Sequence, residues 1–126
     1  MAVAGSPRTL SPIVATVQDW YRSLPLCTKA LFSLLTGIFV LQLATGYDTN
    51  RICLSTDLVV RHHQVYRLIT APFFHLGPWH LLFNMMTFVH IGSSLERNVG
   101  SVQFLHISLL LVVAEGLLYL ALELAA

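Results

Sequence analysis

The sequence predicts an all-α, multi-pass transmembrane helical bundle, and its composition and apolar patterning support this fold class. Hydrophobic residues make up 56% of the 126 positions and charged residues only 10%, whereas ordinary soluble domains carry about a quarter charged residues. The apolar residues are concentrated in three runs, mainly at 30–46, 79–91 and from 102 to the end. With their flanks, these runs approach the roughly 20 residues that an α-helix needs to cross a bilayer. The first partner that the sequence predicts is therefore the lipid bilayer.

The predicted membrane domain comprises residues 29–126, with spans at about 29–46, 79–99 and 102–124. The loop at 47–78 mixes charged and apolar residues, so part of it is expected to lie in the membrane interface or to re-enter the bilayer. Basic residues before the first span favour a cytoplasmic N-terminus by the positive-inside rule, although the loop also contains three arginines.

The preceding residues, 1–28, are expected to form an extramembrane segment with an amphipathic stretch around 13–20. They lack the short apolar core and cleavage site of a signal peptide. Arg8 and Arg22 would suit a mitochondrial transit peptide, but Asp19 and the small number of arginines would not. These features favour the endoplasmic reticulum or the Golgi as the compartment.

Several other classes of site are not supported by the sequence. A net charge of +1 and the lack of any basic run argue against a nucleic-acid partner. Cys27 and Cys53 are too few and too far apart for a metal site or a disulfide framework. Neither His-Glu-x-x-His nor Cys-x-x-Cys occurs, and the His62-His63 pair is expected to be solvated. We therefore predict no metal and no cofactor.

Polar side chains gather on one face of the predicted second span. On a helix, His80, Asn84 and Thr87 fall within a sector of about 80° that also holds Ile91 and Ser94. These polar groups must face a protein interior, because lipid penalises unpaired polar groups by several kcal/mol. Taken alone, such a face is more typical of helix–helix contacts in membranes than of a functional site.

A second face of the same span carries Gly92, Glu96 and Gly100 at a spacing of four residues. Small residues at this spacing let a neighbouring helix approach closely. Glu96 would then need a hydrogen-bond donor, which Ser101 or a group on the first span could provide. This face is expected to be structural.

One series of motifs runs through the middle of the chain. It contains an aromatic–Arg pair, a His, a His-x-x-x-Asn, a Gly, a Glu and a Gly, and its members are Tyr66-Arg67, His75, His80, Asn84, Gly92, Glu96 and Gly100. In order and spacing this series resembles the rhomboid family of intramembrane serine proteases, from about residue 26 to the end. Tyr66 departs from the family's usual Trp but keeps an interfacial aromatic ring.

The resemblance implies a six- or seven-helix bundle that cleaves the transmembrane segments of other proteins. The family uses a Ser–His dyad, with Ser from a Gly-x-Ser-Gly motif on the fourth helix and His from the sixth, because a serine hydroxyl needs an adjacent base. By position, His80 and Asn84 would help to stabilise the oxyanion. Arg67 and His75 would belong to the loop that braces the bundle, and Glu96 would tie helix ends together.

The nucleophile and the base have no counterpart in this chain. The sequence contains no Gly-x-Ser-Gly and no histidine after His106. Ser93 and Ser94 follow Gly92 but no glycine follows them, and Ser93 lies about 140° from the face of His80. We therefore expect three helices of a truncated rhomboid-like fold, inactive alone, which arises by truncation, alternative splicing or an incomplete gene model.

Two alternatives to a protease lineage remain. One is a non-catalytic rhomboid-like membrane module that binds transmembrane clients, and the other is a small structural membrane protein, which the register of the motifs makes a poor fit. His90 and His106 are expected to form hydrogen bonds in the interior. The role of Glu115 stays open: it could be protonated, face the bundle, or pair with His106 or with a further helix.

Overall fold

The computed structural model describes residues 11–48 and 51–126, and every regular element within them is helical. The elements, in chain order, are α1 (Pro12–Ser23), α2 (Leu26–Thr45), α3 (Thr56–Val60), α4 (Arg67–Thr70), the 3₁₀ helix η2 (Ala71–Phe73), α5 (Pro78–Val99) and α6 (Ser101–Ala125). The predicted all-α class is confirmed for this part of the chain.

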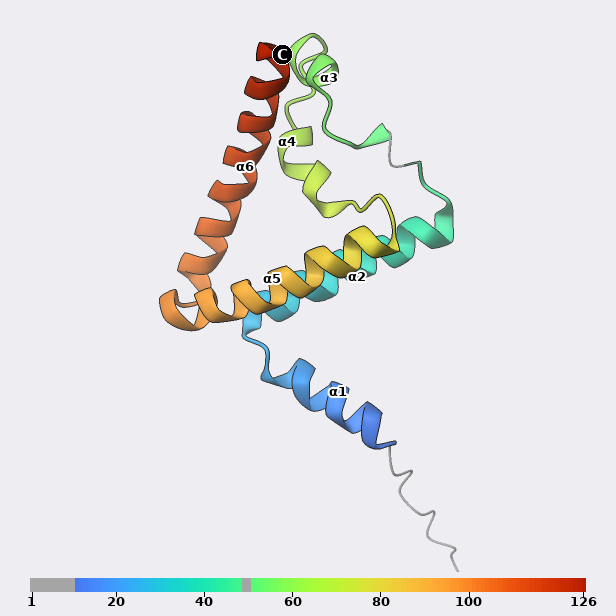
Figure 1. Ribbon diagram of the computed structural model, residues 1–126, viewed down its shortest axis with the longest axis vertical. Helices are drawn as coiled ribbons and strands as arrows, with labels where there is room; N and C mark the ends of the chain where they lie inside the picture. Colours follow the sequence, from blue (N-terminus) through green and yellow to red (C-terminus); the bar gives the residue numbers. More distant parts are fainter. Residues whose placement is uncertain (1–10, 49–50) are drawn as a thin grey trace, which may run out of the picture.

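Three long helices form the body of the molecule. α2 and α5 lie side by side, and α6 starts at the far end of α5 and diverges from both toward the top of the view (Figure 1). The short helices α3 and α4 pack against α6, while α1 projects from the start of α2 on the opposite side (Figure 1). The loop between α2 and α5 is thus folded against the third long helix.

The three long helices match the three predicted spans to within three residues at each end. Length and apolar composition mark two of them, α2 and α6, as candidate membrane spans among the described residues. α5 is 22 residues long, but it carries more polar side chains than the other two. The amphipathic stretch expected before the first span is the helix α1, and residues 1–10 of the predicted extramembrane segment lie outside the described residues.

α2, α5 and α6 meet where the chain passes from α5 to α6. Gly92 faces this meeting point, and a Cβ atom there would lie 3.4 Å from the ring of Phe104 and 3.6 Å from Oγ1 of Thr28. Phe104 and Thr28 are both buried. Gly100 is the single residue between α5 and α6, and its φ of +84° is a conformation that glycine adopts without strain. Glycine therefore permits both the close approach and the tight connection.

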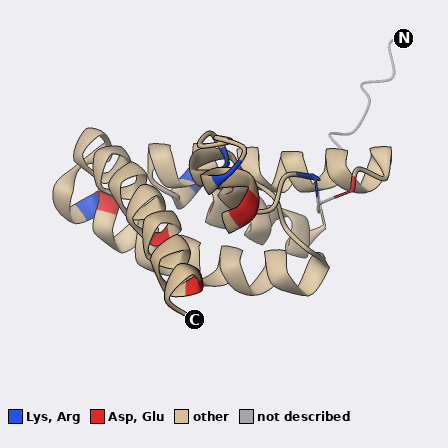
Figure 2. Cartoon of the chain, turned by 90° about the horizontal axis from the view of Figure 1, so that it is seen from above, with Lys and Arg blue, Asp and Glu red and all other residues tan. Residues whose placement is uncertain are grey.

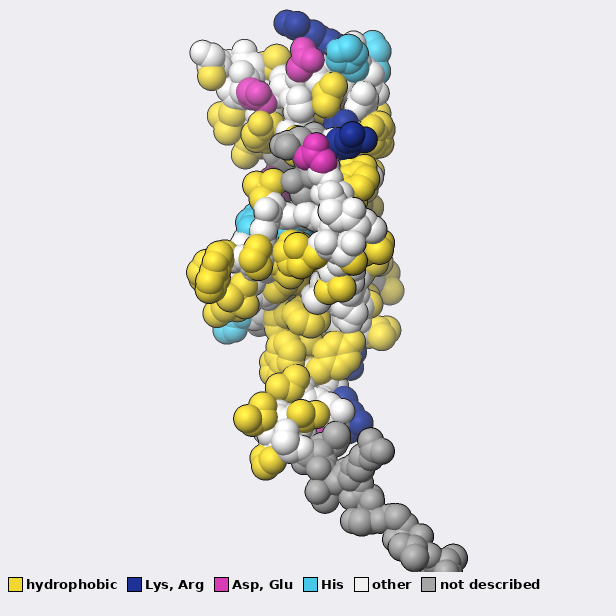
Figure 3. All heavy atoms as spheres, turned by 90° about the vertical axis from the view of Figure 1, so that its right-hand side faces the viewer, with side chains coloured by type: hydrophobic (Ala, Val, Ile, Leu, Met, Phe, Trp, Pro, Cys, Tyr) yellow, Lys and Arg dark blue, Asp and Glu magenta, His cyan; other side chains and the backbone are white. Residues whose placement is uncertain are grey.

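The surface of the bundle is mostly apolar. The ribbon carries few charged residues, gathered at a few places (Figure 2). Figure 3 shows a band of hydrophobic side chains between charged groups above and below it. Large apolar side chains are exposed along both candidate spans; on α6 they include Val102, Leu105, Leu109, Leu110, Leu111, Leu117, Leu118, Leu122 and Leu124. Water would disfavour such a surface and lipid would not.

Candidate active site

An open cavity of about 490 Å³ lies between α4, α5 and α6. Both predicted oxyanion-side residues, His80 and Asn84, line it from α5. Glu115 lines it from α6, and Phe74 and His75 from the loop before α5. The cavity is open, so the side chains of His80 and Asn84 are exposed; Thr87, from the same polar face of α5, is also exposed and does not line the cavity.

The imidazole of His80 is oriented by the loop that precedes its helix. Its Nδ1 accepts a hydrogen bond of 3.3 Å from the backbone N–H of Leu76. A neutral imidazole that accepts at Nδ1 carries its proton on Nε2. In this arrangement His80 can donate a hydrogen bond through Nε2.

His75 packs directly against His80, with 5.4 Å between the ring centroids. Its ring is buried and also meets the ring of Phe39 edge-on at 6.4 Å. Burial lowers the pKa of His75, and the nearby His80 lowers it further. The carbonyl of His75 accepts a hydrogen bond of 2.7 Å from Nε2 of Gln42, near the end of α2. A neutral, buried imidazole is thus fixed between α2 and α5.

Arg67 holds together the loop between α2 and α5. Its side chain is buried, and Nε donates a hydrogen bond of 2.7 Å to Oε1 of Gln64. The terminal nitrogen donates a hydrogen bond of 2.9 Å to the carbonyl of Cys53. The guanidinium also lies 5.7 Å from the ring centroid of Tyr66. These contacts connect the segment before α3 to the start of α4.

Glu96 joins the three long helices at the opposite end of α5. Its carboxylate accepts hydrogen bonds from the backbone N–H groups of Cys27 at 2.8 Å and Thr28 at 2.7 Å. The hydroxyls of Thr28 and Ser101 donate two more, at 2.8 and 2.6 Å. Both donors considered from the sequence, Ser101 and a group on the first span, are therefore present.

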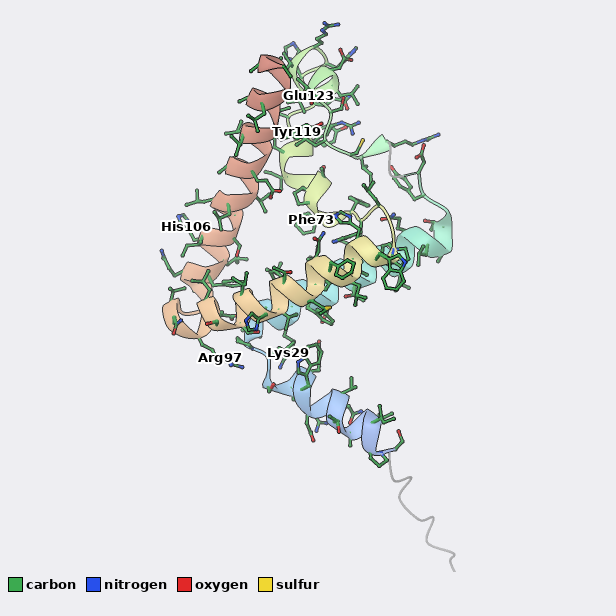
Figure 4. The ribbon with its side chains drawn as sticks, viewed as in Figure 1. Lys29, Phe73, Arg97, His106, Tyr119 and Glu123 are labelled. Atoms are coloured by element: carbon green, nitrogen blue, oxygen red, sulfur yellow. The ribbon has the colours of Figure 1, made fainter. Side chains whose placement is uncertain are left out.

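The structure also brings in residues that the sequence reading did not single out. A Cβ atom on Gly116 would lie 2.8 Å from Cδ2 of Leu68, so this glycine lets α4 approach α6. The hydroxyl of Thr56 donates a hydrogen bond to the carboxylate of Glu123. Tyr119 and Glu123 both extend from α6 toward the loop (Figure 4). In the sequence, only the presence of Gly116 and Glu123 within an apolar run could have indicated these contacts.

The prediction for two histidines is wrong. His90 and His106 are exposed, and neither side chain forms a hydrogen bond within the described residues. Figure 4 shows His106 on the side of α6 that faces away from α4. Glu115 is nine residues further along, which places it about half a turn away, on the cavity side. A pair between His106 and Glu115 is therefore excluded by helix geometry.

Ser93 does not open onto the cavity that His80 and Asn84 line. It is buried and lines a separate cavity with Val89 and His90, but its hydroxyl forms no hydrogen bond within the described residues. Neither Cys27 nor Cys53 forms a disulfide. Among the described residues there is no group of three or more His, Cys, Asp or Glu side chains that could hold a metal ion.

Comparison with known proteins finds several rhomboid-like and rhomboid-related relatives. Rhomboid-like protein 15 of Arabidopsis thaliana is 36% identical over 113 residues, which are 89% of this chain and 28% of that protein. Rhomboid-related protein 4 of Homo sapiens is 36% identical over 58% of the chain and 23% of its own length. A probable derlin-1 homolog of Dictyostelium discoideum is 33% identical over 64% of the chain. No solved structure matches the chain.

The chain spans about a quarter of the length of the first two of these relatives. The rhomboid domain family matches residues 62–126, which include the cavity-lining part of α5 and all of α6. This match covers just over half of the chain, and the residues from Arg67 to Gly100 lie within it. The chain is a membrane protein that belongs to the rhomboid family.

Proposed function

We propose that this chain forms the N-terminal part of a rhomboid-type intramembrane serine endopeptidase and supplies the oxyanion side of its active site. The observation that carries the proposal is the shared cavity of His80 and Asn84. His80 has its Nδ1 occupied by the N–H of Leu76, so its Nε2–H is available as a donor. The side-chain amide of Asn84, one turn further along α5, offers a second donor to the same cavity.

The chemistry divides between this chain and residues that it does not contain. A serine attacks the carbonyl carbon of a substrate peptide bond while a histidine takes the proton from its hydroxyl. The carbonyl oxygen then gains negative charge, and aimed N–H donors stabilise it. His80 and Asn84 provide such donors in the proposal. Because the sequence has no Gly-x-Ser-Gly, this chain alone is expected to be inactive.

A three-span architecture places these donors within the membrane. We propose residues 29–126 as the membrane domain, 1–28 as the extramembrane segment, and α5 as a full span. Two contacts support α5 as a span: Glu96 bonds to the first turn of α2, and the carbonyl of His75 bonds to Gln42 near its last turn. α5 thus runs antiparallel along nearly the whole of α2, an apolar helix long enough to cross a bilayer.

The remaining motif residues are proposed to maintain this geometry. Arg67 and His75 order the loop that positions His80, through the contacts described above. Gly92 and Gly100 allow the close approach and the tight connection at the end of α5. Glu96 fixes that end to α2 and α6. None of these groups needs to touch a substrate.

Two measurements test the proposal. The purified chain should stay unlabelled by a fluorophosphonate probe, since the hydroxyls of Ser93 and Ser94 have no paired base. Co-expression with a C-terminal half that supplies Gly-x-Ser-Gly and the later histidine should restore cleavage of a model transmembrane substrate. Helices that are each formed in the membrane can assemble afterwards. Labelling of the chain alone that Ser93→Ala or Ser94→Ala abolishes would overturn the assignment.

A second candidate is a non-catalytic rhomboid-like module that binds transmembrane clients. The lack of a Gly-x-Ser-Gly in this sequence favours it. It predicts that a transmembrane client can be cross-linked to the cavity face of α5 through a photoreactive group at Asn84, and that no C-terminal half is needed. The protease proposal predicts that the same cross-link depends on the reassembled complex.

The membrane that we propose is that of the endoplasmic reticulum or the Golgi. Asp19 and the small number of arginines in residues 1–26 support this proposal over the mitochondrion. A fluorescent fusion at the C-terminus should co-localise with markers of these membranes. Localisation to mitochondria would contradict the assignment without affecting the proposed chemistry.

A further inference from the structure

α1 separates its apolar and polar side chains onto two faces. Ile13, Val17, Trp20, Tyr21 and Val14 fall within an arc of about 120°. The other side of the helix carries Thr16, Gln18, Asp19, Arg22 and Ser23. Four of the five apolar side chains are exposed, with Ile13 at 76% and Val17 at 56%. The described protein leaves Ile13, Val14 and Val17 of this face uncovered.

The apolar face of α1 is continuous with the apolar exterior of the bundle. The ring of Trp20 meets the ring of Phe32 on α2 edge-on, with 5.8 Å between centroids. The hydroxyl of Tyr21 is 2.6 Å from the hydroxyl of Ser33, also on α2. In Figure 3, hydrophobic side chains on α1 follow directly below the apolar band of the bundle. The end of α1 is therefore attached to a helix that is apolar enough to cross a membrane.

Basic residues cluster at this junction. Nζ of Lys29 donates a hydrogen bond of 3.1 Å to the carbonyl of Arg22, and it lies 5.6 Å from the ring centroid of Tyr21. The guanidinium of Arg97, at the end of α5, donates a hydrogen bond of 3.0 Å to the carbonyl of Ser23. Figure 4 labels Lys29 and Arg97 beside the α1–α2 turn. Cations and aromatic rings together are typical of the depth of lipid headgroups.

We propose that α1 lies in the membrane interface, with its apolar face toward the acyl chains and its polar face toward water. The partner is the lipid bilayer at the end where α2 enters it, and the cations favour anionic headgroups there. An amphipathic helix of this kind sinks its apolar face roughly 5–10 Å into the boundary between headgroups and chains. The inference requires that α2 is inserted, and it is independent of the protease lineage.

Tryptophan fluorescence can test the position of each face of α1 separately. The chain contains two tryptophans, Trp20 and Trp79. In a Trp20→Phe, Trp79→Phe background, Val17→Trp places a single tryptophan on the apolar face and Gln18→Trp places one on the polar face. The full chain is reconstituted in vesicles of phosphatidylcholine and phosphatidylserine whose acyl chains carry bromine near the headgroup or near the chain end.

The proposal predicts that the tryptophan at 17 is quenched more strongly by shallow bromine than by deep bromine. The tryptophan at 18 should be quenched clearly less by either lipid. Lack of quenching at 17 would place α1 in water, and equal or deeper quenching at both positions would place it inside the bilayer, so each result overturns the proposal. The Trp20→Phe variant, whose remaining Trp79 lies at the start of α5, reports separately whether the bundle is inserted.

Discussion

The carboxylate of Glu96 accepts two hydrogen bonds from backbone N–H groups in the first turn of α2. Such groups have no partner within their own helix. The residue at the N-cap position before α2 is Pro25, and it provides no side-chain cap. Glu96 therefore acts as the cap of α2 from another helix, and its negative charge also suits the positive end of that helix dipole.

Glu96→Gln should destabilise the protein by about 2–4 kcal/mol. The glutamine amide keeps one oxygen that accepts hydrogen bonds, but its NH₂ group would face the N–H and O–H donors that surround Glu96. Hydrogen bonds to charged groups contribute about 1.5–3 kcal/mol each. The measurement is the free energy of unfolding in mixed detergent micelles. Asp57→Asn is the matched control, because Asp57 forms an exposed pair with Arg61 at 3.4 Å and such pairs contribute about 1 kcal/mol or less. Equal effects of the two substitutions would contradict the capping role.

At the scale of helices, the sequence predicts the long elements well and the short ones poorly. The three apolar runs fix α2, α5 and α6 to within a few residues, because only a helix satisfies its backbone in lipid. α3 and α4 have five and four residues, too few to show a period, and packing against α6 defines them. The contacts of Glu96 were foreseeable because a buried charge needs donors. The role of Gly116 could not be foreseen, because no second small residue lies four positions before or after it in the apolar run.

The packing of α4 against α6 depends on Gly116. Gly116→Leu should therefore lower the free energy of unfolding by about 1–3 kcal/mol, the usual range for inserting extra atoms into a packed contact. Gly37 in α2 is the matched control, since a Cβ atom there would meet nothing within 4 Å. Gly37→Leu should leave stability unchanged or slightly raise it, because leucine favours a helix more than glycine does. If both variants behave alike in the same micelles, the contact with Leu68 does not hold the loop in place.

At the scale of the whole molecule, the number of spans decides which side of the membrane each end occupies. α2 and α6 meet the length and apolarity expected of spans, and α5 is the proposed third. Three spans put the loop between α2 and α5 on the same side as the C-terminus. Two spans would put them on opposite sides.

Glycosylation tags distinguish the two topologies. With the N-terminus in the cytoplasm, a tag inserted after His63 and a tag fused after Ala126 should both be modified in microsomes, because three spans put both in the lumen. A tag at the N-terminus should stay unmodified. Modification after His63 but not after Ala126 would remove α5 from the set of spans, and modification at the N-terminus would reverse the orientation.

The central claim is that His80 and Asn84 stabilise an oxyanion once a nucleophile and a base are provided. Both line the cavity between α4, α5 and α6, whereas Leu82 lines a different one beside Phe32. The measurement is the rate at which the chain, reassembled with a C-terminal half, cleaves a model transmembrane substrate. His80→Ala and Asn84→Ala should each lower this rate by up to roughly 10²–10³-fold, the usual scale for losing one oxyanion donor. Leu82→Ala should leave it nearly unchanged, and all three variants should still assemble. An active complex whose rate is unaffected by both His80→Ala and Asn84→Ala would contradict the assignment and reduce the polar face of α5 to a packing surface.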